Sequence, residues 1–129
     1  EIKTSEARAI LPSKIELKDA ISQWANVGSL IHALHTSDYG LLQRSLNDTV
    51  IEPYRKKLIP HFDEIKSESI TAGALGCSIS GAGPSIFTLS RGLETANKVK
   101  KAMHSVYEKT DFNYDIHVSE INTQGIKIL

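Results

Sequence analysis

The stretch that decides the fold reads CSISGAGPSIFTLS and covers residues 77–90. Apolar, β-branched and aromatic residues occupy its two arms, while its centre consists of small residues and ends in Gly83-Pro84. This arrangement predicts two short strands joined by a tight loop. Gly81 and Gly83 have no Cβ, so the loop can adopt positive φ and let a ligand approach its backbone N–H groups. Loop chemistry alone favours a plain hairpin turn and a ligand-binding loop equally.

Two longer segments carry apolar residues at the spacing of an amphipathic helix. Residues 15–35 place them at steps of three and four, which predicts the longest helix of the chain and a buried Trp24. A short helix is expected next, with Asp38 as its N-cap and a break at Asn47-Asp48. After the hairpin, residues 94–107 return to the helical period.

Further elements are expected on both sides of the hairpin. Pro60 suits the first turn of a helix that ends at Gly73 or Gly76, directly before the first strand. Residues 115–121 read as a strand, and residues 125–129 as a last short one.

Helices and strands therefore alternate along the chain, and the glycine loop lies in a tight connection between two strands. The sequence predicts an α+β fold with a mostly antiparallel sheet and helices on one face. No internal repeat, low-complexity tract or linker interrupts the sequence, so residues 1–129 are expected to form a single domain.

Charge and composition narrow the class of protein. Fifteen Lys and Arg residues balance fifteen Asp and Glu residues, and no long basic run occurs, which argues against sequence-independent nucleic-acid binding. Cys77 is the single cysteine, so an internal disulfide is excluded. The sequence contains no apolar run long enough to span a bilayer and no secretory signal pattern, so we expect a cytoplasmic protein without a membrane partner.

The residues of the loop match a known signature. Its six residues, Ser80, Gly81, Ala82, Gly83, Pro84 and Ser85, are preceded by Gly73-Ala74-Leu75-Gly76. Together they resemble the third, C-terminal signature of the GHMP kinases, a superfamily that phosphorylates galactose, homoserine, mevalonate and phosphomevalonate.

Two further motifs resemble the homoserine kinase family within that superfamily. Thr4-Ser5-Glu6-Ala7-Arg8 is followed by Leu11-Pro12, and Glu52-Pro53-Tyr54-Arg55 is followed by Leu58-Ile59-Pro60. The three motifs occur in the order and rough spacing of that family and extend over most of the chain, which one glycine loop alone would not establish.

The resemblance implies that this chain is only the C-terminal domain of a homoserine kinase, with a ferredoxin-like fold. The implied activity is ATP-dependent phosphorylation of L-homoserine to O-phospho-L-homoserine in threonine biosynthesis. ATP and Mg would be held mainly by an N-terminal kinase domain that this chain lacks, and the catalytic residues, which this sequence does not identify, would lie there too. The chain alone is expected to be inactive, and the sequence leaves open whether it forms a homodimer.

Arg8 and Arg55 are the candidates for substrate binding. A guanidinium can hold the carboxylate of an amino acid through two parallel charge-assisted hydrogen bonds. Taken by themselves, both residues would be interpreted as surface arginines, because most arginines are solvated. The resemblance places both in the substrate site, and it places the loop from Ser80 to Ser85 near substrate and phosphate.

Other polar residues have structural interpretations. Thr4 suits an N-cap, and Glu52 suits a surface pair with Arg55 or Lys56. The five histidines form no metal-binding motif, so no metal site is predicted. Cys77 fits a small buried thiol.

The sequence alone leaves two alternatives to a homoserine kinase. A small α+β domain with two arginines and a glycine loop also suits a stand-alone regulatory domain that binds an amino acid. The chain could equally be the corresponding half of another GHMP small-molecule kinase. A glycine- and serine-rich phosphate loop upstream would identify a kinase, since a regulatory domain does not need one.

Overall fold

Residues 77–90 form the predicted hairpin in the computed structural model, which describes residues 2–126. Strand β1 (Gly76–Ile79) pairs antiparallel with strand β2 (Ile86–Leu89). These two strands make up the sheet of the described residues, and the glycine loop connects them.

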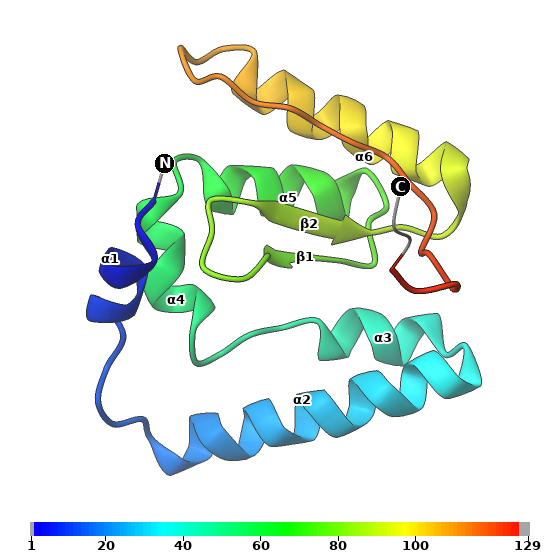
Figure 1. Cartoon of the computed structure of the whole chain (residues 1–129). Coiled ribbons are helices and arrows are strands. Elements are labelled where there is room, and N and C mark those ends of the chain that lie inside the picture. Colours follow the sequence, from blue (N-terminus) through cyan, green and yellow to red (C-terminus); the bar gives the residue numbers. More distant parts are fainter. Residues whose placement is uncertain (1, 127–129) are drawn as a thin grey trace.

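The other elements are helices that lie on both sides of the hairpin. In Figure 1, α5 and α6 lie above the strands and α2 and α3 lie below them. In chain order the helices are α1 (Thr4–Ala9), α2 (Leu17–Thr36), α3 (Tyr39–Ser45), α4 (Glu52–Arg55), the 3₁₀ turn η1 (Lys56–Leu58), α5 (Phe62–Thr71) and α6 (Gly92–Tyr107).

The core lies between the hairpin and the pair of helices α5 and α6. Ile65 of α5, Cys77 of β1 and Val106 of α6 are buried against one another, and Met103 and Tyr107 pack against this cluster. Burial raises the pKa of the Tyr107 hydroxyl, which donates a hydrogen bond to the carbonyl of Pro60. This layer therefore holds the base of the glycine loop in place.

Several predicted helices are confirmed. α2 is the longest, α6 covers the predicted residues 94–107, and the Asp38 carboxylate caps α3 by accepting a hydrogen bond from the N–H of Leu41 at 2.9 Å. α5 begins at Phe62 rather than in the turn of Pro60, because the intervening His61 adopts a left-handed backbone conformation that a helix cannot contain.

The prediction that α2 buries Trp24 is wrong. The side chain is 67% exposed, and its apolar neighbours Ile21 and Ile31 are each 53% exposed. α2 packs on α3, and its buried residues are Ala20 and Ala33. Helical spacing indicates which side chains share a face, but it does not indicate whether another segment covers that face.

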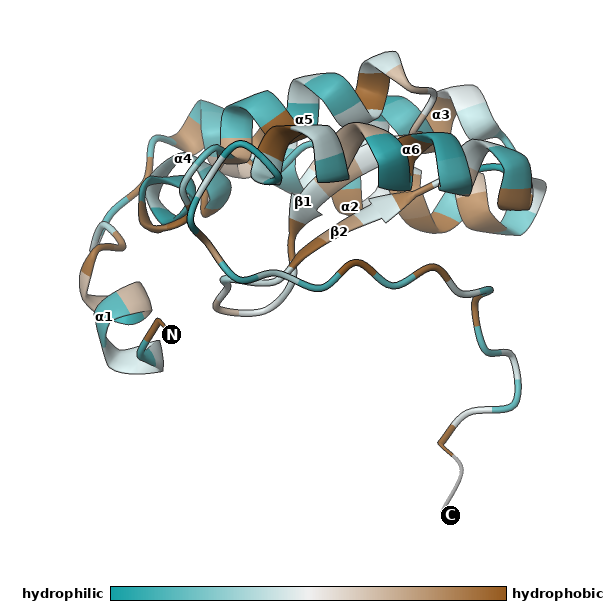
Figure 2. Ribbon diagram, turned by 90° about the horizontal axis from the view of Figure 1, so that it is seen from above, coloured by the Kyte–Doolittle hydropathy of each residue, from teal (hydrophilic) through white to brown (hydrophobic). Residues whose placement is uncertain are grey.

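The strand predicted at residues 115–121 is also not formed. The segment runs as an irregular extended chain and pairs with no strand among the described residues. Figure 2 shows it passing separately from the hairpin and the helices. Of the last predicted strand, residues 125 and 126 are not in a strand and residues 127–129 lie outside the described part of the chain.

Candidate substrate and phosphate site

Arg55 connects the two motifs that the sequence singled out to the glycine loop. It is the last residue of α4 and is half-buried. Its Nη1 donates a 2.6 Å hydrogen bond to the carbonyl of Gly81, and its Nε donates a 3.4 Å hydrogen bond to the carbonyl of Ala7. The guanidinium therefore holds α1 and the loop beside α4, and the N–H groups of its Nη2 have no partner among the described residues.

Arg8 lies in α1, next to the Ala7 whose carbonyl accepts from Arg55. The Arg8 side chain is exposed, and within residues 2–126 its guanidinium has no hydrogen bond or ion pair. All five of its N–H donors can thus bind a ligand. These contacts bring Arg55, the loop and the backbone of α1 together, while no contact within residues 2–126 places the Arg8 side chain beside Arg55 or the loop.

The glycine loop carries backbone donors that the fold does not use. The N–H of Ser80 bonds to the carbonyl of Ser85 at 2.8 Å, and the N–H of Gly83 bonds to the carbonyl of Ser80 at 3.1 Å. Within the described residues the N–H groups of Gly81, Ala82 and Ser85 have no acceptor. Several backbone N–H groups presented by one turn are typical of an anion-binding site.

Position 83 favours glycine, which has no Cβ, for two reasons. Its φ of +85° lies in the left-handed region, and a Cβ there would lie 3.2 Å from Cδ1 of Ile59 and 3.5 Å from Cγ2 of Ile79. Gly81 also has positive φ, at +60°, but a Cβ on it would meet nothing within 4 Å. Gly83 therefore shapes the loop against the core, whereas Gly81 faces open space.

Glu52 has a role that sequence reasoning missed. Instead of pairing on the surface with Arg55 or Lys56, it is 7% exposed, forms an ion pair with Lys66 of α5, and accepts a 2.9 Å hydrogen bond from the Ser78 hydroxyl of β1. A buried carboxylate needs such partners because burial removes its hydration. Only the match of the Glu52-Pro53-Tyr54-Arg55 motif pointed to this residue, since nothing in its spacing indicates burial.

The other polar candidates have structural rather than chemical roles. Thr4 is the first residue of α1 rather than its cap, and the cap position at Lys3 has no side-chain hydrogen bond. Cys77 is 1% exposed, and burial raises the pKa of its thiol to about 11, so the thiolate needed for nucleophilic chemistry is disfavoured. Within residues 2–126, no cluster of three His, Cys, Asp or Glu side chains is arranged to hold a metal ion.

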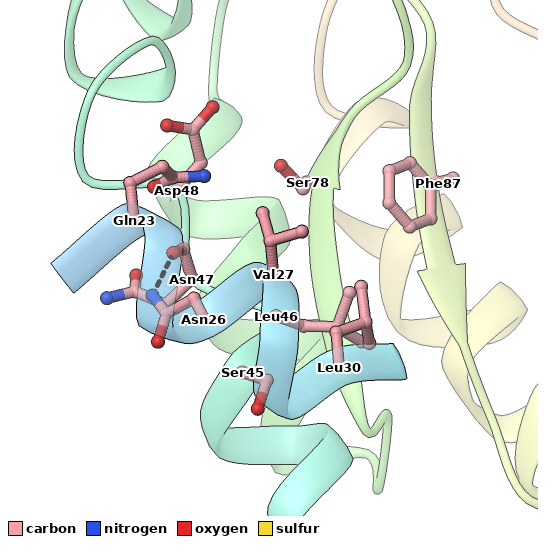
Figure 3. Close-up of a pocket in the computed structure, with 10 residues that line it drawn as sticks. All are labelled: Gln23, Asn26, Val27, Leu30, Ser45, Leu46, Asn47, Asp48, Ser78 and Phe87. Atoms are coloured by element: carbon pink, nitrogen blue, oxygen red, sulfur yellow. Dashed lines mark hydrogen bonds between the residues drawn. The ribbon is translucent and has the colours of Figure 1, made fainter. Parts of the chain in front are cut away.

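A small pocket of about 130 Å³ lies away from Arg55, between α2, the end of α3 and the hairpin. Figure 3 shows Val27 and Leu30 of α2 on one side of it and Ser78 and Phe87 of the strands on the other. The Asn26 side chain donates a 2.8 Å hydrogen bond to the carbonyl of Asn47 at its rim. The pocket thus contains neither arginine nor the loop, and it marks incomplete packing between α2 and the sheet.

Comparison with known families identifies the chain. The family model described as GHMP kinases C terminal matches residues 30–109, which include the complete hairpin and its loop. The chain belongs to this family. The confirmed α+β fold with an antiparallel hairpin agrees with that membership.

The chain is similar over its whole length to curated homoserine kinases. It is 50% identical to the homoserine kinase of Chlorobium phaeovibrioides, with 41% of that protein covered, and 47% identical to that of Chlorobaculum tepidum, with 40% covered. The crystal structure of homoserine kinase from Cytophaga hutchinsonii superposes with a TM-score of 0.93 at 47% identity, covering 97% of this chain and 40% of that one. The chain spans about two fifths of the length of these relatives.

None of the helices within residues 2–126 has the length and apolar character needed to cross a bilayer.

Proposed function

We propose that this chain is the C-terminal domain of a homoserine kinase, which transfers the γ-phosphoryl group of ATP to the side-chain hydroxyl of L-homoserine. The product, O-phospho-L-homoserine, would serve threonine biosynthesis in the cytoplasm. Residues 1–129 would form a single domain, and an N-terminal domain of the longer protein would hold most of the ATP and Mg. The homoserine kinases that match this chain along its whole length support this assignment.

The observation that supports the proposal is the contact of Arg55 with the glycine loop and with the backbone of α1, the helix that carries Arg8. A zwitterionic amino acid presents a carboxylate, which a guanidinium fork binds well. Arg8 has its whole fork available, whereas Arg55 uses Nε and Nη1 for the carbonyls of Ala7 and Gly81 and keeps Nη2. Arg8 would therefore bind the carboxylate, and Arg55 would add a donor while it fixes the loop.

The loop would act on the phosphate side of the site. Phosphoryl transfer depends on positioning and on donors directed at the transferred group more than on a nucleophilic side chain. The N–H groups of Gly81, Ala82 and Ser85 suit such donors, since no acceptor among the described residues occupies them. Gly83 and Pro84 would keep them in position, and Ser80 would close the turn through its carbonyl.

The test is an assay of ADP release from Mg-ATP on addition of L-homoserine, run with the longer protein and with this chain. Turnover that depends on homoserine and occurs only in the longer protein is the expected result. If neither protein turns over but homoserine still binds, the chain is an amino-acid-binding domain and the kinase assignment is wrong. If another small alcohol replaces homoserine as the preferred substrate, the chain belongs to a different GHMP kinase.

Variants of the two arginines in the longer protein test the site itself. Arg8→Ala should raise the KM for homoserine by about 30-fold, equivalent to roughly 2 kcal/mol, because a carboxylate partner is lost. Arg55→Ala should raise the KM and also lower the melting temperature, since it removes the contacts to Ala7 and Gly81. Arg44→Ala is the matched control, because Arg44 is an exposed arginine on α3. Unchanged kinetics in both site variants would remove the arginines from the substrate site.

A further inference from the structure

Helix α4 carries Arg55 but is too short to hold its own position. It has four residues, with Glu52 as the first and Arg55 as the last. A single helical turn is not stable by itself, because its few backbone hydrogen bonds do not offset the ordering of its residues. The position of Arg55 must therefore come from contacts that α4 makes with the rest of the fold.

Both ends of α4 are bonded to the hairpin. At the C-terminal end, Nη1 of Arg55 donates a hydrogen bond to the carbonyl of Gly81. At the N-terminal end, the carboxylate of Glu52 accepts a 2.9 Å hydrogen bond from the hydroxyl of Ser78. Ser78 precedes Gly81 by the same number of positions as Glu52 precedes Arg55. α4 is thus held at two points beside the loop end of the hairpin (Figure 1).

An ion pair connects the same carboxylate to the core. Glu52 pairs with Lys66 of α5, and Ile65, the residue before Lys66, is fully buried. Both side chains of the pair lie mostly out of water, so salt screens their interaction little. A buried carboxylate is costly without a cation, so Glu52 needs a positively charged partner within its reach.

Lys66 also determines whether Glu52 pairs with Arg55. Glu and Arg three positions apart on a helix are neighbours and can form an ion pair. Here Oε1 of Glu52 is bonded to Lys66 and Oε2 to Ser78. Within residues 2–126 no ion pair joins Glu52 and Arg55. Arg55 therefore keeps its charge and the N–H groups of Nη2 for a ligand.

We propose that Glu52 and Lys66 are positioning residues for Arg55. Lys66 and Ser78 hold the Glu52 carboxylate against α5 and β1, which fixes α4 and leaves the Arg55 guanidinium without a partner on its own helix. The carboxylate of the substrate can then bind Nη2 of Arg55. This role rests on the proposed binding of homoserine by Arg55 and adds the residues that keep this arginine available.

Lys66→Met in the longer protein tests this role. Methionine keeps an unbranched side chain but removes the cation, so Glu52 loses its partner and should pair with Arg55 instead. The KM for homoserine should rise by about tenfold, while kcat and the KM for ATP change by less than about threefold. An unchanged KM for homoserine in the folded variant would overturn the proposal.

Lys56→Met is the matched control. Lys56 directly follows Arg55 and also forms an ion pair with α5, through Asp63, but this pair is more exposed and does not involve Glu52. The KM for homoserine should stay within about twofold of the wild-type value, because exposed ion pairs contribute little. A rise equal to that of Lys66→Met would mean that any ion pair with α5 has this effect, which contradicts the role of Glu52.

Two double variants show whether the effect of Lys66 passes through Glu52 and Arg55. Adding Glu52→Gln to Lys66→Met removes the unpaired charge and should return the KM for homoserine to within about threefold of wild type. Adding Lys66→Met to Arg55→Ala should leave the KM of Arg55→Ala unchanged, because the residue that Lys66 acts on is already gone. No recovery in the first variant, or a further increase in the second, would contradict the proposal.

Melting temperatures of all variants separate folding from binding. If Lys66→Met does not fold, Ser78→Ala decides in its place. It removes one hydrogen bond to Glu52 and should raise the KM for homoserine by about threefold, and an unchanged KM would overturn the proposal.

The wild-type protein distinguishes this role from the proposed function. If the longer wild-type protein does not turn over homoserine, the proposed function is wrong, and the positioning role with it. If wild type turns over homoserine and Lys66→Met has the same KM, only the positioning role is wrong.

Discussion

Helices α6 and α2 have similar apolar spacing but opposite surroundings. On α6, Val99 and Val106 are 1% and 4% exposed, since α5 packs on this helix and Val106 also lies against Cys77 of β1. On α2, Trp24 and Ile21 are 67% and 53% exposed. The comparison shows that an amphipathic pattern determines the direction of an apolar face, while the partner that covers this face comes from elsewhere in the chain or in a longer protein.

The strongest test of this comparison replaces one buried isoleucine and one exposed isoleucine. Ile65→Ala should lower the free energy of unfolding by about 2–5 kcal/mol, since Ile65 of α5 is fully buried against β1 and α6. Ile21→Ala removes the same atoms from an exposed site and should change it by about 0.5 kcal/mol or less. Urea unfolding of this chain measures both. Equal losses would mean that the two faces are covered alike.

A pair of glycine variants tests the contact between β1 and Leu46, which follows the last residue of α3. A Cβ on Gly76 of β1 would lie 2.5 Å from Cδ1 and 2.6 Å from Cβ of Leu46, so Gly76→Ala should cost about 1–3 kcal/mol. Gly28→Ala in α2 is the control, because a Cβ there meets nothing within 4 Å and alanine favours helix by up to about 1 kcal/mol. Opposite shifts of the urea midpoint are expected. A neutral Gly76→Ala would show that Leu46 moves aside easily.

Trp24→Gln should have a smaller effect. In this chain the indole is mostly in water, so the free energy of unfolding should change by about 0.5 kcal/mol or less. The chain contains a single tryptophan, so acrylamide quenching of its fluorescence reports on this site directly. Quenching close to that of the unfolded chain is expected here. A shielded indole in the longer protein would mean that its additional residues cover α2.

The smallest effect is expected on the solvent side of α6. Lys98 forms a 2.8 Å ion pair with Glu94 and lowers the pKa of that carboxyl by a hydrogen bond and by its charge. A lowered pKa adds stability above the unfolded-state pKa, and this stability is lost as the pH falls through the folded-state value. Glu94→Gln should therefore reduce stability slightly at neutral pH and not at all in acid. Urea melts at both pH values check this, and a difference that persists in acid would contradict it.

Much of the fold could be predicted from local signals. The turn residues of 80–85 identified the hairpin, the period of 3.6 identified α2 and α6, and Asp38 identified a helix start. Burial could not be predicted in the same way, because the exposure of Trp24 and the missing strand at 115–121 depend on contacts between distant segments.

The candidate site could likewise be predicted only in part. Arg8, Arg55 and the loop could be named from motifs, and the structure places Arg55 in contact with the loop. The buried position of Glu52, with Lys66 and Ser78 as partners, could not be named, since its neighbours in space lie 14 and 26 residues away. Residue type and spacing identify groups that can bind a ligand, but they do not reveal which charged groups hold the elements together.

The single thiol of this chain has a practical consequence. With a pKa of about 11 and 1% exposure, the Cys77 side chain at pH 8 is ionised in roughly one molecule in a thousand and is out of reach of reagents in water. A thiol-specific dye can then react only during the intervals when β1 separates from α5 and α6. The rate of labelling therefore measures how often this layer opens, and the measurement needs no engineered cysteine.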